Sequence, residues 1–273
     1  MADTPDQTID IDAVREGAEE AVRAASAAIR AVLQQRTVKV GYKDFGEGPV
    51  TEADYAADAI LRERLVPLIE GARWLSEESS EVAPLIRGEP TWVVDPLDGT
   101  REFLRGLPEF GVSVGLFVGD ELVFGVVGLP VQDEVYSGLI WGDRLEARKD
   151  GVPLPLLPND GIVEQVVVSR HDYEDRRIGY MLPWKSYPVG SAVLKLVYAA
   201  TRPTHVYFST GPRSVWDVAG GAALLMATGG MLMMVNGKTL RLSPQQIGIP
   251  PYAAGAPADC RVLLSELGVK FDD

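Results

Sequence analysis

Two aspartates at the end of an apolar run are the residues of this sequence best placed to do chemistry. They are Asp95 and Asp98, in the segment 92–100, which reads Trp-Val-Val-Asp-Pro-Leu-Asp-Gly-Thr. The apolar residues predict a short buried strand, which Pro96 is expected to close because proline has a fixed φ and no N–H group. Gly99 permits a tight turn that leaves N–H groups beside the carboxylates. Such a turn suits a divalent cation and a phosphate, although Asp-Pro and Asp-Gly also form ordinary turns.

Further acidic residues occur at the ends of other predicted elements. Glu77 follows an apolar run, and Asp54 and Asp217 each lie in the first turn of a predicted helix. Each also has an ordinary explanation, namely a solvated turn, a capping box and the helix dipole, respectively. Together with Asp95 and Asp98 they are oxygen donors without an accompanying His–Cys set, which favours Mg²⁺ or Mn²⁺ over zinc. Several anionic ligands in one site suggest more than one metal ion, as used for in-line phosphoryl displacement.

The start of a predicted helix at 191–200 is a candidate seat for a phosphate. Gly190 and Ser191 open this helix, and the free N–H groups and dipole of a helix N-terminus attract anions. Ser191 is also suited to act as an ordinary N-cap. Both interpretations of this helix start remain open at the level of the sequence.

The charge of the chain restricts the kind of partner it can bind. The 273 residues include 26 basic and 39 acidic side chains, which gives a formal net charge of −13. This charge disfavours nucleic acid, which requires a basic surface. It would also repel a phosphate ester unless bound Mg²⁺ reversed the local field. We therefore expect a small-molecule phosphate ester as the partner and several carboxylates as metal ligands.

Cysteine content and hydropathy favour a cytoplasmic protein. Cys260 is the only cysteine, so no intrachain disulfide can form, which fits a reducing compartment. No apolar run approaches the ~18 residues that span a membrane, so no membrane partner is expected. The acidic segment 1–6 also differs from the basic start of a signal peptide.

The N-terminal part of the chain, 1–152, must position most of the candidate metal ligands. Apolar residues at helical spacing predict two helices there, and alternation with a period of two predicts an antiparallel meander at 110–148. A short strand is expected directly before Glu77. The remaining expected segments are a frayed end at 1–9, the helices at 10–35 and 52–69, a loop at 36–49 and the strand at 73–76.

The C-terminal part, 153–273, is expected to contribute Asp217 and the contacts to the substrate. A segment rich in proline, at 153–161, is the best candidate for the boundary between the two parts. Beyond it, strand-like and helix-like segments alternate, which indicates layered α/β structure. The expected strands are 164–169, 204–209 and 231–235, and the expected helices are 172–181, 191–200 and 214–227.

Four acidic motifs in order resemble the signature of the inositol-monophosphatase superfamily. They are Asp95-Pro96-Leu97-Asp98-Gly99-Thr100, Trp216-Asp217-Val218-Ala219-Gly220-Gly221, Val50-Thr51-Glu52-Ala53-Asp54 and Ser76-Glu77-Glu78-Ser79. The resemblance covers about 10–240, which is most of the chain. It implies an α/β fold, an αβαβα sandwich with an N-terminal antiparallel sheet flanked by helices and a C-terminal α/β half.

Within that superfamily the chain is most similar to the bisphosphate nucleotidases of the bacterial CysQ type. The similar segments are Thr100-Arg101-Glu102-Phe103, Val166-Val167-Val168-Ser169-Arg170 and Gly190-Ser191-Ala192-Val193-Leu194-Lys195. Thr210 also stands where inositol-specific members carry an acid. The resemblance implies a Mg²⁺-dependent phosphomonoesterase that removes the 3′(2′)-phosphate of adenosine 3′(2′),5′-bisphosphate or its sulfated analogue. The alternatives are an inositol-1-monophosphatase, a fructose-1,6-bisphosphatase and a non-catalytic protein that binds phosphate or metal.

The resemblance also implies a role for each acidic residue. Glu77, Asp95 and the Leu97 carbonyl would hold one Mg²⁺; Asp95, Asp98 and Asp217 would hold a second, and Glu77 would help to hold a third. Thr100, oriented by Asp54, would orient the attacking water, so that Asp54, Thr100 and Glu77 are the expected catalytic residues. The family likeness further implies inhibition by Li⁺ and a monomer or homodimer.

The expected substrate contacts come from three segments. Gly99, Thr100 and Ser191, with Gly190, would neutralise charge on the phosphoryl oxygens. Ser169 and Arg170 would contact the nucleotide, and Arg170 and Lys195 would bind its other phosphate. For Arg170 and Lys195, an ordinary surface salt bridge is the open alternative.

Overall fold

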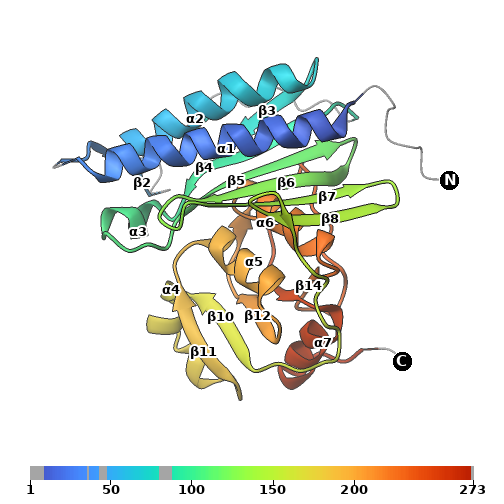
Figure 1. The fold of residues 1–273 in the computed structure, drawn as a ribbon. Coiled ribbons are helices and arrows are strands. Elements are labelled where there is room, and N and C mark those ends of the chain that lie inside the picture. The colour runs from blue at the N-terminus through green and yellow to red at the C-terminus, as the bar shows by residue number, and fades with distance from the viewer. Residues whose placement is uncertain (1–8, 36, 43–47, 80–87, 272–273) are drawn as a thin grey trace.

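The layers of the fold run helix, sheet, helix, sheet, helix (Figure 1). The structure is a computed structural model that describes residues 9–35, 37–42, 48–79 and 88–271. Most of the predicted frayed end and part of the predicted loop lie outside these residues. The αβαβα architecture expected from the sequence is confirmed.

Two long helices form the outer layer above the larger sheet (Figure 1). The first begins at Asp10, whose carboxylate accepts a hydrogen bond from the Ala13 N–H at 3.2 Å, and it buries the predicted apolar stripe against the sheet. The second is preceded by a small hairpin. These elements are α1 (Ile11–Leu33), β1 (Val40–Tyr42), β2 (Pro49–Thr51), α2 (Glu52–Leu65) and the 3₁₀ helix η2 (Val66–Leu68). The helices predicted at 10–35 and 52–69 are therefore confirmed.

The larger sheet carries the predicted meander, and its described strands follow the order β3-β4-β5-β6-β7-β8-β9. β3 and β4 are parallel, and each later pair of neighbours is antiparallel. The strands are β3 (Arg73–Ser76), β4 (Thr91–Asp98), β5 (Gly111–Val118), β6 (Glu121–Leu129), β7 (Glu134–Trp141), β8 (Arg144–Lys149) and β9 (Val152–Pro153), with the short helix α3 (Thr100–Leu104) after β4.

Strand β4 does not end at Pro96, which corrects the prediction. Asp95 pairs with Ser113, and the register shifts before Asp98 pairs with Gly111. One extra residue therefore lies on β4, and Pro96, which has no N–H group to pair, lies within this bulge. The strand continues through the bulge to Asp98.

The middle layer consists of α5 (Ala192–Thr201) and α6 (Val215–Ala227), which fill the space between the sheets (Figure 1). α6 packs very closely on the larger sheet because the sheet presents glycines to it. A Cβ atom at Gly115 would lie 2.6 Å from the Ala219 Cβ, and one at Gly138 would lie 2.4 Å from the Leu224 Cα. The small residues of α6 and the glycines of the sheet thus permit the close approach.

The smaller sheet covers the other side of the middle layer and has the order β11-β10-β12-β16-β14 among its described strands. β10 is parallel to both neighbours, whereas β16 is antiparallel to both. The strands are β10 (Gln165–Ser169), β11 (Lys185–Val189), β12 (His205–Ser209), β14 (Met231–Met234) and β16 (Tyr252–Gly255). The remaining elements are α4 (Arg170–Glu174), the 3₁₀ helix η3 (Ile178–Tyr180), α7 (Pro257–Glu266) and the pair β13 (Arg213–Ser214) and β15 (Gly248–Ile249).

The helix predicted at 172–181 is wrong. The chain forms only the short α4 and the 3₁₀ turn η3, with Arg177 in the left-handed region at φ 53°. The strand β11 that follows was not predicted, and it contains Pro188. β11 lies at the edge of its sheet, where a missing N–H is tolerated.

Candidate metal and active site

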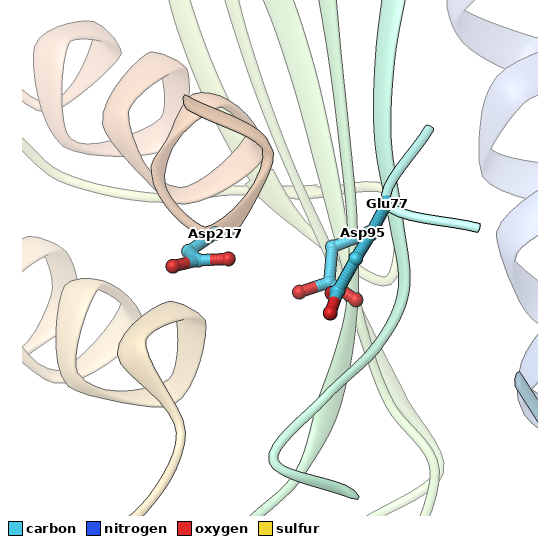
Figure 2. Close-up of side chains that lie close together, drawn as sticks. All are labelled: Glu77, Asp95 and Asp217. Atoms are coloured by element: carbon cyan, nitrogen blue, oxygen red, sulfur yellow. The ribbon is translucent and has the colours of Figure 1, made fainter. Parts of the chain in front are cut away.

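Three carboxylates from three different elements meet between the two sheets. Glu77 follows β3, Asp95 lies in β4, and Asp217 lies in the first turn of α6; one oxygen from each lies within 4.8 Å of those of the other two. Figure 2 shows Asp217 pointing towards Glu77 and Asp95, whose carboxylates lie together. The structure thus brings together three of the predicted metal ligands.

The β4 bulge explains why these side chains face the same way. Residues three apart in a regular strand point to opposite faces, but Asp95 and Asp98 are paired with Ser113 and Gly111, which share one face. That face is the one covered by the middle layer, because the Ser113 hydroxyl donates to the Trp216 carbonyl oxygen at 2.8 Å. The bulge therefore directs both aspartates towards the start of α6.

The register of β3 and the start of α6 complete the group. Ser76 pairs with Val94 in parallel, and the Glu77 N–H donates to the Val94 carbonyl oxygen at 3.0 Å, so the next position places Glu77 beside Asp95. On α6, the Ser214 N–H donates to the Asp217 carboxylate at 3.0 Å in a capping box. The predicted cap at Asp217 and its predicted place in the site occur together.

The charges of this group call for a cation. Burial raises the pKa of Asp95 well above its ordinary value, and the negative charges of Glu77, Asp98 and Asp217 raise it further. Burial, with the charges of Asp98 and Glu77, raises the pKa of Asp217 to about 7. A divalent cation would neutralise the repulsion, and an all-oxygen donor set suits Mg²⁺. The residues therefore fit the predicted metal.

Asp98 lies close to the group but is bound to the start of α5. One of its oxygens accepts hydrogen bonds from the Ser191 hydroxyl at 2.5 Å and the Val193 N–H at 2.7 Å. Burial raises its pKa, whereas the Lys195 charge and these hydrogen bonds lower it. The other oxygen accepts no hydrogen bond from the part of the chain that the structure describes, so a ligand role for Asp98 stays a prediction.

Thr100 connects the metal-site strand to α2. Its hydroxyl lies 3.1 Å from an Asp54 oxygen and 3.1 Å from the Leu97 carbonyl oxygen. A hydroxyl has a single hydrogen, so it donates to one of these acceptors at a time. Asp54 also accepts from the Thr51 N–H at 2.8 Å, so it both caps α2 and contacts Thr100. The two explanations offered for Asp54 are compatible.

The turn between β11 and α5 is occupied by protein contacts. The Gly190 N–H donates to Glu109 at 2.8 Å, and the Ser191 hydroxyl accepts from the Leu194 N–H at 3.0 Å as an N-cap. A Cβ atom at Gly190 would lie 2.2 Å from the Glu102 side chain, so a larger residue there would require Glu102 to move. The structure supports the N-cap interpretation of Ser191.

Lys195 is neither a surface salt bridge nor within reach of a substrate phosphate, which corrects both interpretations. Its side chain is fully buried, and its ammonium group donates to the carbonyl oxygens of Val189, Gly190 and Ser191 at 2.9, 2.9 and 2.6 Å. An ammonium group has three hydrogens, so these bonds use all of them. Lys195 instead fixes the turn whose Ser191 holds Asp98.

Arg170 and Ser169 lie at the start of α4. The Ser169 hydroxyl donates to Asp172 at 2.7 Å and caps this short helix. Arg170 donates to Glu109 at 2.6 Å and lies 3.6 Å from Glu174. Arg170 is therefore in the salt bridges offered as the alternative, while its side chain also lines a cavity.

A cavity of about 400 Å³ is lined by residues of α3, α4 and the segments before α5 and α6, and its volume is within the range of small-molecule sites. Its lining includes Gly190 and Arg213, which stand one residue before Ser191 and four before Asp217 in the sequence. Sequence reasoning missed Arg101, Arg105 and Arg213, although all three flank the acidic motifs. The lining residues are Arg101, Glu102, Arg105, Ser169, Arg170, His171, Asp172, Glu174, Asp175, Arg176, Gly190, Gly211, Pro212 and Arg213.

Comparison with known proteins gives a family and several relatives. A model of the inositol monophosphatase family matches residues 10–262. A 3′(2′),5′-bisphosphate nucleotidase CysQ from Salmonella typhimurium is 32% identical over 212 residues, covering 75% of this chain and 84% of that protein. Inositol monophosphatase 1 from Solanum lycopersicum is 30% identical over 211 residues, covering 72% and 76%.

A solved structure supports the fold. The extragenic suppressor protein suhB from Bartonella henselae matches with a TM-score of 0.77 at 23% identity, over 93% of this chain and 98% of that chain. Within the described residues, none of the helices combines the length and apolar character needed to cross a membrane.

Proposed function

Since this chain belongs to the inositol monophosphatase family, we propose that it is a Mg²⁺-dependent phosphatase for adenosine 3′(2′),5′-bisphosphates. The reaction is hydrolysis of the 3′(2′)-phosphate by water. The observation that carries the proposal is the convergence of Glu77, Asp95 and Asp217, whose oxygens lie within 4.8 Å of one another. We expect a cytoplasmic protein acting on a small molecule as a monomer or homodimer.

The metal ligands of the proposed enzyme are the acidic residues of the site. When bound, Mg²⁺ supplies the positive charge that activates water and stabilises the leaving oxygen. The Leu97 carbonyl oxygen is available as a ligand when the Thr100 hydroxyl turns to Asp54. The proposed sets are Glu77, Asp95 and Leu97 for one ion, Asp95, Asp98 and Asp217 for a second, and Glu77 for a third.

Thr100 and Asp54 are proposed to orient the attacking water. When Thr100 donates its hydrogen to Asp54, its lone pairs are free to accept a hydrogen bond from water. The Gly99 and Thr100 N–H groups would donate to the phosphoryl oxygens where negative charge grows. Gly99 suits this turn because its φ is 99°, a backbone conformation that residues with a Cβ rarely adopt.

The cavity lined by arginines supports a substrate with a second phosphate. Arg170 lines this cavity with other arginines, and guanidinium groups bind phosphates through charge-assisted hydrogen bonds. The CysQ relative from Salmonella typhimurium is named for such substrates. We therefore keep Arg170 and Ser169 as proposed contacts to the nucleotide.

A panel of phosphate esters tests this function. Phosphate release is measured with adenosine 3′,5′-bisphosphate, inositol 1-phosphate and fructose 1,6-bisphosphate at saturating Mg²⁺. We expect the highest kcat/KM with the adenosine bisphosphate, loss of all activity with EDTA, and inhibition by Li⁺. A preference for either other substrate would reassign the substrate but keep the phosphatase chemistry.

Inositol monophosphatase activity is the second candidate, because the Solanum lycopersicum relative with that name is nearly as similar. A non-catalytic protein that binds phosphate or metal is a third. Calorimetric binding of the adenosine bisphosphate without any phosphate release at saturating Mg²⁺ would favour that third candidate over both enzymes.

A further inference from the structure

Arg213 is a half-buried cation that forms no ion pair with a carboxylate of the described chain, although Tyr207 and the more distant charge of Asp217 help to raise its pKa. Its Nε donates to the Tyr207 hydroxyl at 3.4 Å, and no carboxylate of the described residues lies within ion-pair distance of it. Removing a guanidinium from water is costly unless an anion compensates its charge. An anionic ligand would supply the ion pair that the described residues do not form.

The surroundings of Tyr207 contain a second cation besides Arg213. The Tyr207 side chain is fully buried, and the Lys195 ammonium lies 5.3 Å from the centre of its ring. Burial opposes ionisation of Tyr207, yet the charges of Arg213 and Lys195 leave its pKa below the ordinary value. Because Lys195 bonds only carbonyl oxygens, it adds to the positive potential around Arg213.

The other arginines of the cavity fall into two groups. Arg170 is paired with Glu102, Glu109 and Glu174, and Arg176 is paired with Asp172. These carboxylates reduce the net positive charge on that side of the cavity, so Arg170 is a weaker contact for a second phosphate than an arginine without an ion pair.

Arg101 and Arg105 belong to the second group. Both are exposed, Arg101 in α3 and Arg105 at its C-cap, and neither has an ion pair with a carboxylate of the described residues. The cavity thus has arginines without an ion pair in the described chain at two positions, namely Arg213, and Arg101 and Arg105 in and directly after α3. An anion in the cavity would interact with both.

We propose that Arg213 is a specificity-determining residue that binds the second, non-reacting anionic group of the substrate. The inference rests on the proposed function, in which the reacting phosphate lies at Glu77, Asp95 and Asp217. It adds that phosphate esters with a second phosphate are preferred to esters without one. Arg213 lines the cavity and is near enough to Asp217 for their charges to interact, so it can contact such a group while the ester phosphate is at the carboxylates.

The test compares two substrates that lose the same 3′-phosphate. Adenosine 3′,5′-bisphosphate and adenosine 3′-monophosphate differ only in the second phosphate. In Arg213→Gln we expect KM for the bisphosphate to rise about 10- to 100-fold, since a hydrogen bond to a charged group contributes about 1.5–3 kcal/mol. KM for the monophosphate should change less than about threefold, because it makes no contact with Arg213.

Two further variants separate binding from structure. Arg213→Lys keeps the charge but loses the planar fork, so its KM for the bisphosphate should lie between those of the wild type and Arg213→Gln. Arg202→Gln is the matched control, because Arg202 is exposed, stacks on Tyr198 at 3.4 Å and lies outside the cavity lining. It should retain wild-type KM for both substrates.

The outcomes distinguish this inference from the proposed function. Equal losses on both substrates, or no change on either, in folded Arg213→Gln would overturn the role of Arg213. If Arg213→Gln does not fold, an unchanged KM for the bisphosphate in Arg213→Lys would do the same. Wild-type protein that hydrolyses both esters equally well would overturn the inference alone, whereas absence of any Mg²⁺-dependent hydrolysis would overturn the proposed function.

Discussion

The Asp98 carboxylate accepts hydrogen bonds from the start of α5 and is also proposed to bind a metal ion. It accepts hydrogen bonds from Ser191 and Val193, and asparagine can accept the same bonds through its carbonyl oxygen. We therefore predict that Asp98→Asn keeps the fold but lowers kcat at least about 10²-fold, because a neutral amide is a poor ligand for Mg²⁺. Phosphate release and a thermal melt of the purified variant measure the two effects.

The matched control for this variant is Asp143→Asn. Asp143 is exposed in the turn between β7 and β8, so its replacement should leave kcat unchanged. Wild-type kcat in a folded Asp98→Asn protein would remove Asp98 from the proposed set of ligands.

The raised pKa of Asp217, about 7, predicts that Mg²⁺ binding depends on pH. Metal requires the ionised carboxylate, so below pH 7 a proton must leave when Mg²⁺ binds. Affinity for Mg²⁺ should rise with pH up to about pH 7 and then level off. Calorimetric titrations at pH 6 and pH 8, in buffers of different ionisation enthalpy, measure both affinity and proton release. Equal affinity at the two pH values without proton release would contradict the prediction.

The same raised pKa predicts that the folding stability of the metal-free protein falls as pH rises. The folded state binds the Asp217 proton more tightly than the unfolded chain, whose aspartates have pKa values near 3.8. Folding stability contributed by this proton is present at low pH and is lost as pH rises to about 7. Melting temperatures in EDTA should therefore fall between pH 5 and pH 8, and Asp217→Asn should reduce that fall.

Residue types and spacing predicted the acidic residues well but not the cations. Glu77, Asp95 and Asp217 were expected together, and they do converge. Lys195 was misassigned because spacing does not show burial, although the apolar residues on both sides of it indicate a buried helix. Arg213 was missed because a single arginine in a short strand has no pattern of its own.

At the scale of elements, the β4 bulge decides the geometry of the site. Pro96 was expected to end the strand, which is wrong, because a strand end and a bulge can have the same local sequence. Only the pairing with β5 shows that one extra residue puts Asp95 and Asp98 on one face. The register of neighbouring strands is therefore the information that the motif lacks.

The close packing of α6 gives a prediction about stability. In Gly138→Ala the new Cβ would lie 2.4 Å from the Leu224 Cα and 2.5 Å from the Ala223 carbonyl oxygen, both of which are backbone atoms. We predict a loss of about 3 kcal/mol in the free energy of unfolding, because overpacking costs about 1–3 kcal/mol even where side chains can adjust. Denaturant unfolding of the variant measures this loss.

Gly248→Ala is the control for the packing prediction. A Cβ atom there would have no atom within 4 Å, and its φ is not positive. A change of less than about 0.5 kcal/mol is expected. Equal stabilities of the two variants would mean that the sheet and α6 do not depend on this close approach.

At the scale of the whole molecule, the site lies where the two halves of the chain meet. Glu77 and Asp95 come from the first half, Asp217 comes from the second, and α6 packs on the larger sheet of the first half. The larger sheet ends at β9, close to the predicted boundary at 153, but the division into parts at 1–152 and 153–273 stays a prediction. The alternation of elements predicted the layers, and the family resemblance predicted their order. Neither indicated the edge strand β11, whose proline is tolerated only because of its place in the sheet.

The central claim is that acids from both halves bind divalent cations together. Anomalous scattering from a Mn²⁺-soaked crystal tests it most directly, because Mn²⁺ takes the same oxygen ligands as Mg²⁺ and its position is seen without assumptions about activity. We predict at least one anomalous peak within coordination distance of Glu77, Asp95 and Asp217. No peak there at saturating Mn²⁺, or peaks only at other acidic residues, would contradict the account.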